Sequence, residues 1–346
     1  MPISSKRVLA AGVAVVAAGA GLSGCRSSGA ENVDDSAHPS MTIMVGGIDK
    51  VIYLPAKLAE NLGYFKDSGV DVTLKTEPAG AEAENLLIAN KVDGVVGFYD
   101  HSVTLQAAGK CVESVVQLAK VPGEAEVVSN DADISGPSDF DGKKLGVTSP
   151  GSSTDYLTQY LATKNGVDTS DYTTVTAGAG SDFIAAMQND GIDAGMTTDP
   201  TIAQVEKQGL GKVLLDMRTE EGTKEALGGL YPAASLYMDC DYVEQNPETV
   251  QKVATAFVKT LQWISTHSPA QIAAEMPEDY NGGDPALYEQ SIKDSMPSFT
   301  DDGVMPEGGP ETVLDVLGTF NPDVEEKKDD IDLSKTYTTQ FVENAG

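Results

Sequence analysis

Two short stretches, ANKVDGVV at residues 89–96 and QNDGIDAG at residues 188–195, decide the fold. Each ends a helical pattern with a polar turn that contains an aspartate, and each continues into an apolar strand pattern. A polar segment follows both strands, YDHS at 99–102 and TTDP at 197–200. Open α/β sheets bind ligands at the carboxyl ends of their strands. The repeat therefore predicts two similar α/β lobes with a ligand cleft between them.

The same alternation of strand and helix patterns extends from residue 41 to about residue 238. Because helices separate the strands, we expect parallel pairing with crossover helices. The predicted strands cover residues 41–45, 70–74, 94–98, 112–118, 126–129, 144–147, 173–175, 194–197, 212–216 and 232–238. The predicted helices cover residues 52–62, 82–89, 101–108, 155–164, 182–189 and 201–208, and a long helix follows the Asn246 cap to about residue 266.

The order of these patterns divides the chain into five segments. The expected segments are a signal peptide at 1–24, a flexible tether at 25–39, the first part of lobe I at 40–128, lobe II at 129–232, and the second part of lobe I with C-terminal helices at 233–346.

The N-terminus predicts where the protein works. Lys6 and Arg7 precede an apolar run at 8–20, which is shorter than the roughly 20 residues that span a membrane. Residues 22–24 (LSG) lie directly before Cys25, and this ending resembles a bacterial lipobox. We expect Cys25 to be acylated and to anchor the mature protein outside the bacterial cell membrane. The alternative is a signal sequence in which the cysteine has no such role.

Charge limits the partners and the ligand. The chain has 53 acidic and 23 basic residues, a net charge of −30. Phosphate binding needs a basic face, so this composition argues against a nucleic-acid partner. Arginine, which usually clamps carboxylates and sulfonates, occurs only as Arg7, Arg26 and Arg218. The single arginine beyond the tether disfavours an arginine-clamped sulfonate.

The remaining cysteines and the histidines carry weaker signals. Cys111 and Cys240 are the two cysteines after Cys25, and in an oxidising exterior they form a disulfide or remain buried free thiols. The histidines, His38, His101 and His267, are too scattered to indicate a metal site.

The loop at 149–154 (SPGSST) is the strongest candidate for ligand contact. It leads directly into a helix, where backbone N–H groups and small hydroxyls converge. Helix capping by Ser152 or Ser153 is the alternative function. Gly180 begins another helix and could add N–H donors. The predicted contacts here are Ser149, Ser152, Ser153, Thr154 and Gly180.

In lobe I the segment after the strand at 94–98 offers aromatic and polar side chains. Tyr99 is expected to lie against a flat ligand, with His101 or Ser102 on its polar rim. Asp100 is a further candidate, although it could simply cap the next helix while His101 points to solvent.

Tyr53 could face the same cleft, or belong to the core or the surface. Lys50 is expected to be solvated. At the corresponding strand end of lobe II, the candidates are Thr197, Thr198 and Asp199.

Several segments in order resemble the type 2 periplasmic binding proteins of the nitrate/sulfonate/taurine and thiamine-pyrimidine family. This resemblance implies two α/β lobes joined by a two-strand hinge near residues 121–129 and 230–238, with lobe II inserted into lobe I and the ligand cleft between them. The matching segments are LGYFKDSGVDV at 62–72, KVDG at 91–94, DFDGKKLGV at 139–147, PGSST at 150–154, and IDA at 192–194 with DP at 199–200.

The resemblance also implies a function. The protein would be a solute-binding lipoprotein of an ABC importer that delivers its ligand to a permease and its ATPase. We expect a monomer without cofactor, metal or enzymatic activity, and a ligand that is a small aromatic or heteroaromatic compound or a sulfonate-like anion. One alternative is a membrane-tethered sensor without transport. The other is an enzyme like the pyrimidine synthase of the same fold, whose cysteine-rich iron-binding segment this sequence lacks.

Overall fold

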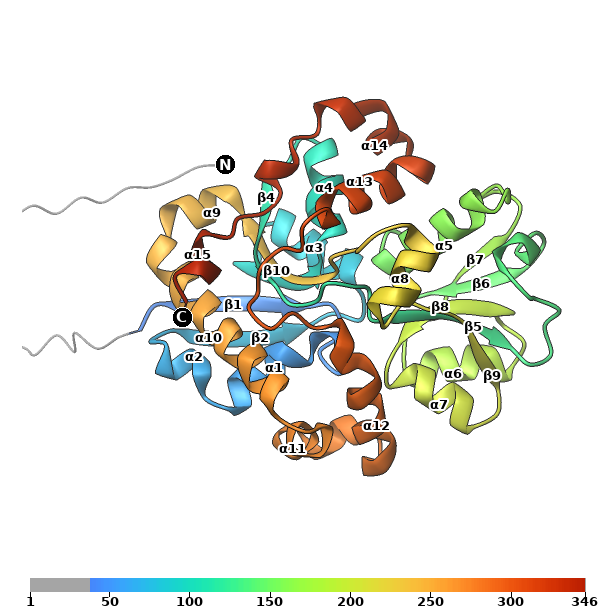
Figure 1. Cartoon of the computed structure of the whole chain (residues 1–346), viewed down its shortest axis with the longest axis horizontal. Helices are drawn as coiled ribbons and strands as arrows, with labels where there is room; N and C mark the ends of the chain where they lie inside the picture. Colours follow the sequence, from blue (N-terminus) through green and yellow to red (C-terminus); the bar gives the residue numbers. More distant parts are fainter. Residues whose placement is uncertain (1–37, 346) are drawn as a thin grey trace, which may run out of the picture. The chain divides into compact units, whose positions relative to one another are not determined.

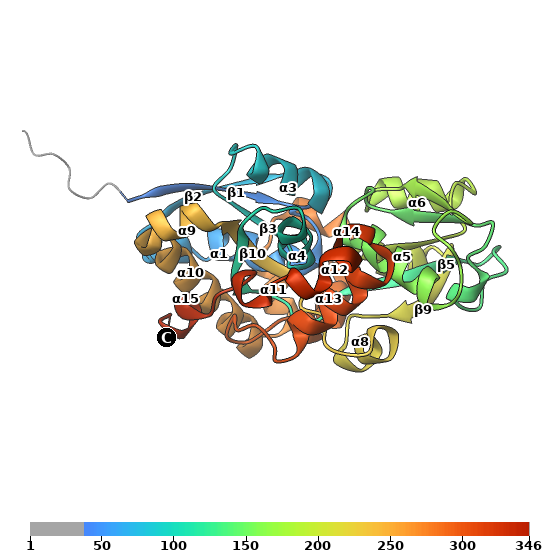
Figure 2. The ribbon, with the colours of Figure 1, turned by 90° about the horizontal axis from the view of Figure 1, so that it is seen from above.

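The computed structural model describes residues 38–345, which contain two five-stranded sheets (Figures 1 and 2). The first, in the order β2-β1-β3-β10-β4, consists of β1 (Ser40–Val45), β2 (Asp71–Thr76), β3 (Gly94–Phe98), β4 (Val112–Gln117) and β10 (Ala234–Asp239). The second, in the order β7-β6-β8-β5-β9, consists of β5 (Glu124–Ser129), β6 (Lys144–Val147), β7 (Thr173–Thr176), β8 (Ala194–Thr198) and β9 (Gly211–Asp216). Each sheet, with the helices packed on its faces, forms one lobe, named I and II in this order.

The two sheets are mixed, so the expectation of parallel pairing throughout is wrong. β1 pairs in parallel with β2 and β3, and β6 pairs in parallel with β7 and β8. β10 is antiparallel to β3 and β4, while β5 is antiparallel to β8 and β9. The physical reason is that β5 and β10 each arrive from the other lobe. Parallel neighbours need a crossover helix on the same sheet, and no such helix precedes β5 or β10.

Helices cover both faces of the lobe I sheet. On one face Ile43 packs in a core with Phe65 and Phe257, whose ring centroids are 5.4 Å apart. On the other face Met44 packs against Ala83. The α-helices of this lobe are α1 (Leu54–Asn61), α2 (Tyr64–Asp67), α3 (Gly80–Ile88), α4 (Asp100–Ala107), α9 (Cys240–Gln245), α10 (Pro247–Thr266), α11 (Pro269–Glu275), α12 (Pro285–Ser295), α13 (Gly309–Phe320), α14 (Pro322–Lys327) and α15 (Gln340–Glu343).

Lobe II repeats the three-layer arrangement around strand β5, coloured green in Figure 1. Ala125 and Val127 face a core formed with Phe183 and Ile202. Because strand side chains alternate, Glu126 points to the opposite face. The helices are α5 (Ser153–Lys164), α6 (Ser181–Gln188), α7 (Thr201–Lys207) and α8 (Glu220–Leu227). Short 3₁₀ turns in the two lobes cover Val51–Tyr53, Pro137–Asp139, Glu278–Asn281, Met296–Ser298, Lys328–Asp330 and Leu333–Lys335.

The chain crosses between the lobes twice. It leaves lobe I between β4 and β5 and returns between β9 and β10. The two crossing segments are hydrogen-bonded to each other, for example from the Ala233 N–H to the Ala119 carbonyl at 3.0 Å. All of β5 pairs within the second sheet, so the boundary expected at residues 128–129 falls too late in the chain.

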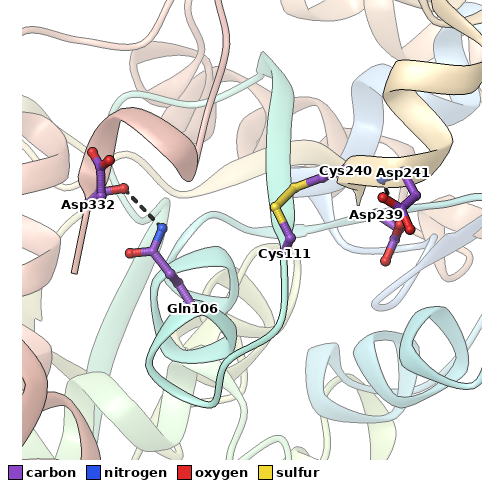
Figure 3. The surroundings of a disulfide bond; sticks show 6 residues. All are labelled: Gln106, Cys111, Asp239, Cys240, Asp241 and Asp332. Carbon is purple, nitrogen blue, oxygen red and sulfur yellow. Dashed lines mark hydrogen bonds between the residues drawn. A yellow bond between two sulfur atoms is a disulfide. The ribbon is translucent and has the colours of Figure 1, made fainter. Parts of the chain in front are cut away.

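A disulfide joins Cys111 to Cys240 (Figure 3), which decides between the two states left open from the sequence. Cys111 directly precedes β4 and Cys240 directly follows β10, at the ends of this strand pair where Val112 lies opposite Asp239. The bond spans 129 residues and thereby encloses every strand of lobe II. In the chain-entropy treatment, closing a loop of this length stabilises the fold by about 4–5 kcal/mol.

Within residues 38–345, no helix is long and apolar enough to cross a membrane. The predicted signal peptide at 1–24, the acylated Cys25 and nearly all of the predicted tether lie outside the described residues.

Candidate functional site

A small cavity is lined by residues of both lobes. Its wall includes the carboxyl ends of β6 and β8, the loop after β1, and the start of α5, which is where α/β sheets bind ligands. The free volume is about 10 Å³, close to the space that one water needs, so the lobes are closed on each other. The lining residues are Lys50, Ile52, Tyr53, Gly80, Glu124, Thr148, Ser152, Ser153, Thr154 and Thr198.

The serines at the start of α5 contact the opposite lobe. Ser152 Oγ accepts from the Ala81 N–H at 3.2 Å, and Ser149 Oγ donates to Glu82 Oε2 at 3.1 Å. Within the described residues, no hydrogen bond joins the Ser152 hydroxyl to its own helix, so the capping alternative is wrong for Ser152. Thr154 instead closes the loop, because its Oγ1 accepts from the Thr148 N–H at 3.0 Å.

Asp100 lies behind the cavity wall. Its Oδ1 accepts from Ser153 Oγ of lobe II at 2.9 Å, and its Oδ2 accepts from the Tyr231 hydroxyl at 2.8 Å. The carboxylate is therefore a contact between lobes and not the helix cap considered from the sequence. Burial raises the pKa of Asp100, while His101, Tyr231 and Ser153 act in the opposite direction.

His101 is completely buried, which excludes the solvent-pointing alternative. Its Nδ1 is hydrogen-bonded to Glu84, and its Nε2 lies 3.7 Å from Asp100 Oδ1. Burial lowers the pKa of His101, but Glu84 and then Asp100 outweigh burial and raise the value to about 9. The adjacent Ser102 is also buried, and its hydroxyl has no partner among residues 38–345. Neither side chain lines the cavity.

Tyr99 points away from the cavity. Its ring is buried, its hydroxyl is hydrogen-bonded to Thr336, and its edge packs on Tyr337 with centroids 6.3 Å apart. The structure therefore does not place Tyr99 where a flat ligand could stack. Tyr53 is the aromatic side chain that lines the cavity, with its ring 6.3 Å from Phe98 in an edge-on arrangement.

Lys50 and Glu124 were not among the residues expected at the site. Lys50 is 7% exposed, so the expectation of a solvated lysine is wrong. Its ammonium donates to the carbonyls of Gly46 at 2.8 Å and Pro78 at 3.0 Å, and these hydrogen bonds hold it inside. Burial lowers the pKa of Lys50 to about 8, against the opposing effect of Glu124 and other acids.

Glu124 is 3% exposed, and burial raises its pKa well above the usual range. Its Oε2 has no hydrogen-bond partner in the described part of the chain. It begins β5 in the sequence EAEVVS, where an acidic residue alternates with apolar ones. The predicted strand covered only residues 126–129. Glu124 therefore fell outside it and was not considered as a site residue.

At the strand end of lobe II, Thr198 lines the cavity and its Oγ1 donates to the Gly123 carbonyl at 2.9 Å. Thr197 is buried within the lobe and does not line it. Asp199 is bound by Arg218, whose Nη1 lies 2.9 Å from Asp199 Oδ2. Arg218 also binds Asp216 at 2.7 Å, so the guanidinium is engaged outside the cavity. Burial lowers the pKa of Arg218, but these two carboxylates outweigh burial and raise it.

Gly180 lines a second, larger groove of about 580 Å³. This groove also takes residues from both lobes, among them Asp49, Tyr280 and Gln204, and it shares Lys50 with the cavity. Within residues 38–345, no group of three or more His, Cys, Asp or Glu side chains is arranged to hold a metal ion.

The family model described as "NMT1/THI5 like" matches residues 53–271, more than half of the chain. The chain belongs to the NMT1/THI5-like family. A Bordetella bronchiseptica RB50 protein of solved structure is 35% identical, with a TM-score of 0.84 over 88% of this chain and 96% of that one. The match confirms the family resemblance and the two-lobe fold that were expected from the sequence.

Two curated proteins of different kinds are similar to this chain. The nitrate/nitrite binding protein NrtA of Nostoc sp. is 23% identical over 75% of this chain and 66% of its own length. The 4-amino-5-hydroxymethyl-2-methylpyrimidine phosphate synthase THI11 of Saccharomyces cerevisiae is 26% identical over 61% of this chain and 63% of its own length. The chain is thus similar both to a binding protein and to an enzyme.

Proposed function

We propose that this chain is an extracytoplasmic solute-binding lipoprotein of an ABC importer, which captures a small organic solute by closing its two lobes. The observation that carries the proposal is the cavity lined from both lobes at the carboxyl ends of their strands. The similarity of the chain to a nitrate/nitrite binding protein supports it. The ligand would be a small aromatic or heteroaromatic compound or a sulfonate-like anion, with Tyr53 as the ring that contacts it.

Closure must be coupled to binding for such a protein to work. Moving the lobes from 1:99 to 99:1 in favour of the closed state takes about 5.5 kcal/mol of differential binding. The direct hydrogen bonds between lobes, from Ser149 to Glu82 and from Ser153 to Asp100, stabilise the closed arrangement without any solute. The solute must therefore supply the differential binding itself, through contacts with both lobes.

The test is a thermal-shift screen of the full-length chain against a library of nitrogenous bases, carboxylates, sulfonates and inorganic oxyanions. Hits are then examined by small-angle X-ray scattering, and we expect the radius of gyration to fall when a bound solute closes the lobes. A chain that stays unchanged with every member of the library would contradict the solute-binding proposal. Catalytic turnover of a hit would favour the enzyme alternative instead.

The double variant Ser152→Ala plus Ser153→Ala tests the loop at the start of α5. We expect at least a tenfold loss of affinity for the screened solute, with a smaller relative loss of thermal stability, because both side chains line the cavity. Ser170→Ala, at an exposed serine of lobe II, is the matched control. A large drop in the melting temperature with unchanged affinity would assign these serines to stability alone.

Anchoring and transport need separate tests. Replacement of Cys25 by serine should abolish incorporation of labelled palmitate and release the protein from the membrane fraction. Deletion of the gene should abolish uptake of the identified solute through the partner permease and ATPase, while a sensor would leave uptake intact. Sedimentation of the soluble protein should show a monomer.

A further inference from the structure

The cavity contains one acceptor that the closed fold leaves without a partner. Glu124 is nearly fully buried, its side chain lines the cavity, and its Oε2 has no hydrogen-bond partner among residues 38–345. Leaving a buried carboxylate oxygen without a donor costs more free energy than most single hydrogen bonds contribute. A group that supplies a donor at this position would recover that cost.

The donors already present near Glu124 are committed elsewhere. Two of the three N–H groups of Lys50 are used by the Gly46 and Pro78 carbonyls. The Lys50 ammonium does not donate to Glu124 Oε2, which has no partner in the described part of the chain, although the two groups influence each other's pKa. The Thr198 hydroxyl donates to the Gly123 carbonyl.

Acidic side chains dominate the surroundings. Besides Glu124 on the cavity wall, Asp100 accepts a hydrogen bond from Ser153 of the wall, and Glu82 accepts one from Ser149 of the adjoining loop. Arg218, the single arginine of the described residues, is held by Asp199 and Asp216. An oxyanion entering the closed cavity would meet these acidic groups, and Lys50, the cation on the cavity wall, has two of its three N–H groups already committed to carbonyls.

We propose that the solute of this site presents a hydrogen-bond-donating nitrogen, as in an amidine, an amine or an amino-heterocycle, to Glu124, and that such a donor binds more tightly than an oxyanion of similar shape. This inference rests on the proposed function and narrows its ligand. Tyr53 on the same wall supplies a face for a planar solute, which fits an amidine or amino-substituted ring better than an aliphatic amine.

The chain contains a matched control for Glu124 two residues farther along β5. Glu126 is also completely buried, and neither of its carboxylate oxygens has a partner in the described part of the chain. Glu126 does not line the cavity. The substitutions Glu124→Gln and Glu126→Gln therefore make the same chemical change on the same strand at similar burial, but only one of them alters the proposed site.

The experiment compares benzamidine with benzoate, two planar probes of nearly equal shape and opposite charge, by titration calorimetry on the full-length chain. 2-Aminopyrimidine and benzenesulfonate form a second pair. We expect the wild type to bind the nitrogen donor of each pair at least tenfold more tightly than its anionic partner. Glu124→Gln should weaken donor binding at least tenfold, and Glu126→Gln should leave it within twofold of the wild type.

The outcomes separate this inference from the proposed function. A preference for benzoate or benzenesulfonate, or equal loss in the two variants, would overturn the role of Glu124 while leaving a solute-binding protein in place. If no probe and no member of the screening library binds, both proposals fail. Should Glu124→Gln not fold, the wild-type preference within the two probe pairs still decides the ligand class.

Discussion

Asp100 and Asp199 lie just beyond the carboxyl ends of β3 and β8, Asp100 as the second residue after its strand and Asp199 as the first, and each contacts a serine of the opposite lobe. Asp100 accepts from Ser153 at 2.9 Å, and Asp199 accepts from Ser295 of α12 at 3.1 Å. Their other partners differ. Asp199 is paired with Arg218, while Asp100 is held by the Tyr231 hydroxyl and lies near His101.

The difference shows two ways of compensating a buried carboxylate near the carboxyl end of a strand. The guanidinium of Arg218 keeps its charge at every physiological pH. The imidazole of His101 can lose its proton, so the compensation of Asp100 depends on pH. We therefore expect the stabilisation of the Asp199 contact to be independent of pH and the stabilisation of the Asp100 contact to change with pH.

The largest loss of stability is expected in Arg218→Met, which removes the guanidinium charge beside Asp199. Asp199 would keep its burial and lose its cation, and breaking a buried pair on one side costs about 3–5 kcal/mol. The measurement is the free energy of unfolding from urea denaturation at neutral pH. Lys335→Met is the control, because Lys335 pairs with Asp332 at the exposed surface, where a salt bridge contributes about 0–1 kcal/mol.

If both variants lost similar stability, the Arg218 pair would contribute no more than a surface pair, and the proposed contrast between the two aspartates would fail. If the double variant Arg218→Met with Asp199→Asn kept the stability of the wild type, the contrast between the two aspartates would become sharper. That result would show that the cost comes from the uncompensated carboxylate and not from lost packing of the long side chain.

The repeat in the sequence located both aspartates but not their partners. The strands at 94–98 and 144–147 were predicted with the bounds that the structure has, because their apolar runs are short and end at turns. Ser153 and Tyr231 come from segments that follow Asp100 by 53 and 131 residues, and their approach depends on lobe packing. No local pattern encodes such a distance.

The mixed pairing and the buried charges were missed for a related reason. Periodicity indicates that a segment such as 232–238 is a strand, but it does not indicate which neighbour the strand joins. Lys50 and Glu124 are of residue types that usually lie at the surface, and segments distant in the sequence pack around them and bury them. The loop at 149–154 was recognised because hydroxyls before a helix form a local signal.

The next largest effect is a pH dependence on the Asp100 side. The pKa of His101 is raised from 6.5 to about 9, so between these values the folded state binds the proton and the unfolded state does not. This contribution to stability is fully present below pH 6.5 and is lost as the pH rises through about 9. It amounts to about 3 kcal/mol. We expect His101→Gln to remove this part of the decline between pH 6.5 and 9.

The comparison must be made as a difference between wild type and variant, because other buried groups titrate nearby. Burial raises the pKa of Glu126 to about 8, so stability also falls between pH 4.5 and 8 from that residue. Burial lowers the pKa of Lys50 to about 8, which makes stability rise between pH 8 and 10.5. Identical pH slopes for wild type and His101→Gln would contradict the pH dependence expected for the Asp100 contact.

The smallest effects are expected from the two serines that reach across the lobes. Ser153→Ala should destabilise by about 1–2 kcal/mol, since Asp100 then keeps the Tyr231 hydroxyl as its one direct hydrogen-bond donor. Ser295→Ala should cost about 0.5–1 kcal/mol, because Arg218 still donates to Asp199. Urea denaturation of both variants at pH 7 measures the ranking. A larger loss of unfolding free energy in Ser295→Ala would contradict this ranking. It would mean that Asp199 needs the Ser295 hydroxyl of the opposite lobe even with Arg218 bound to it.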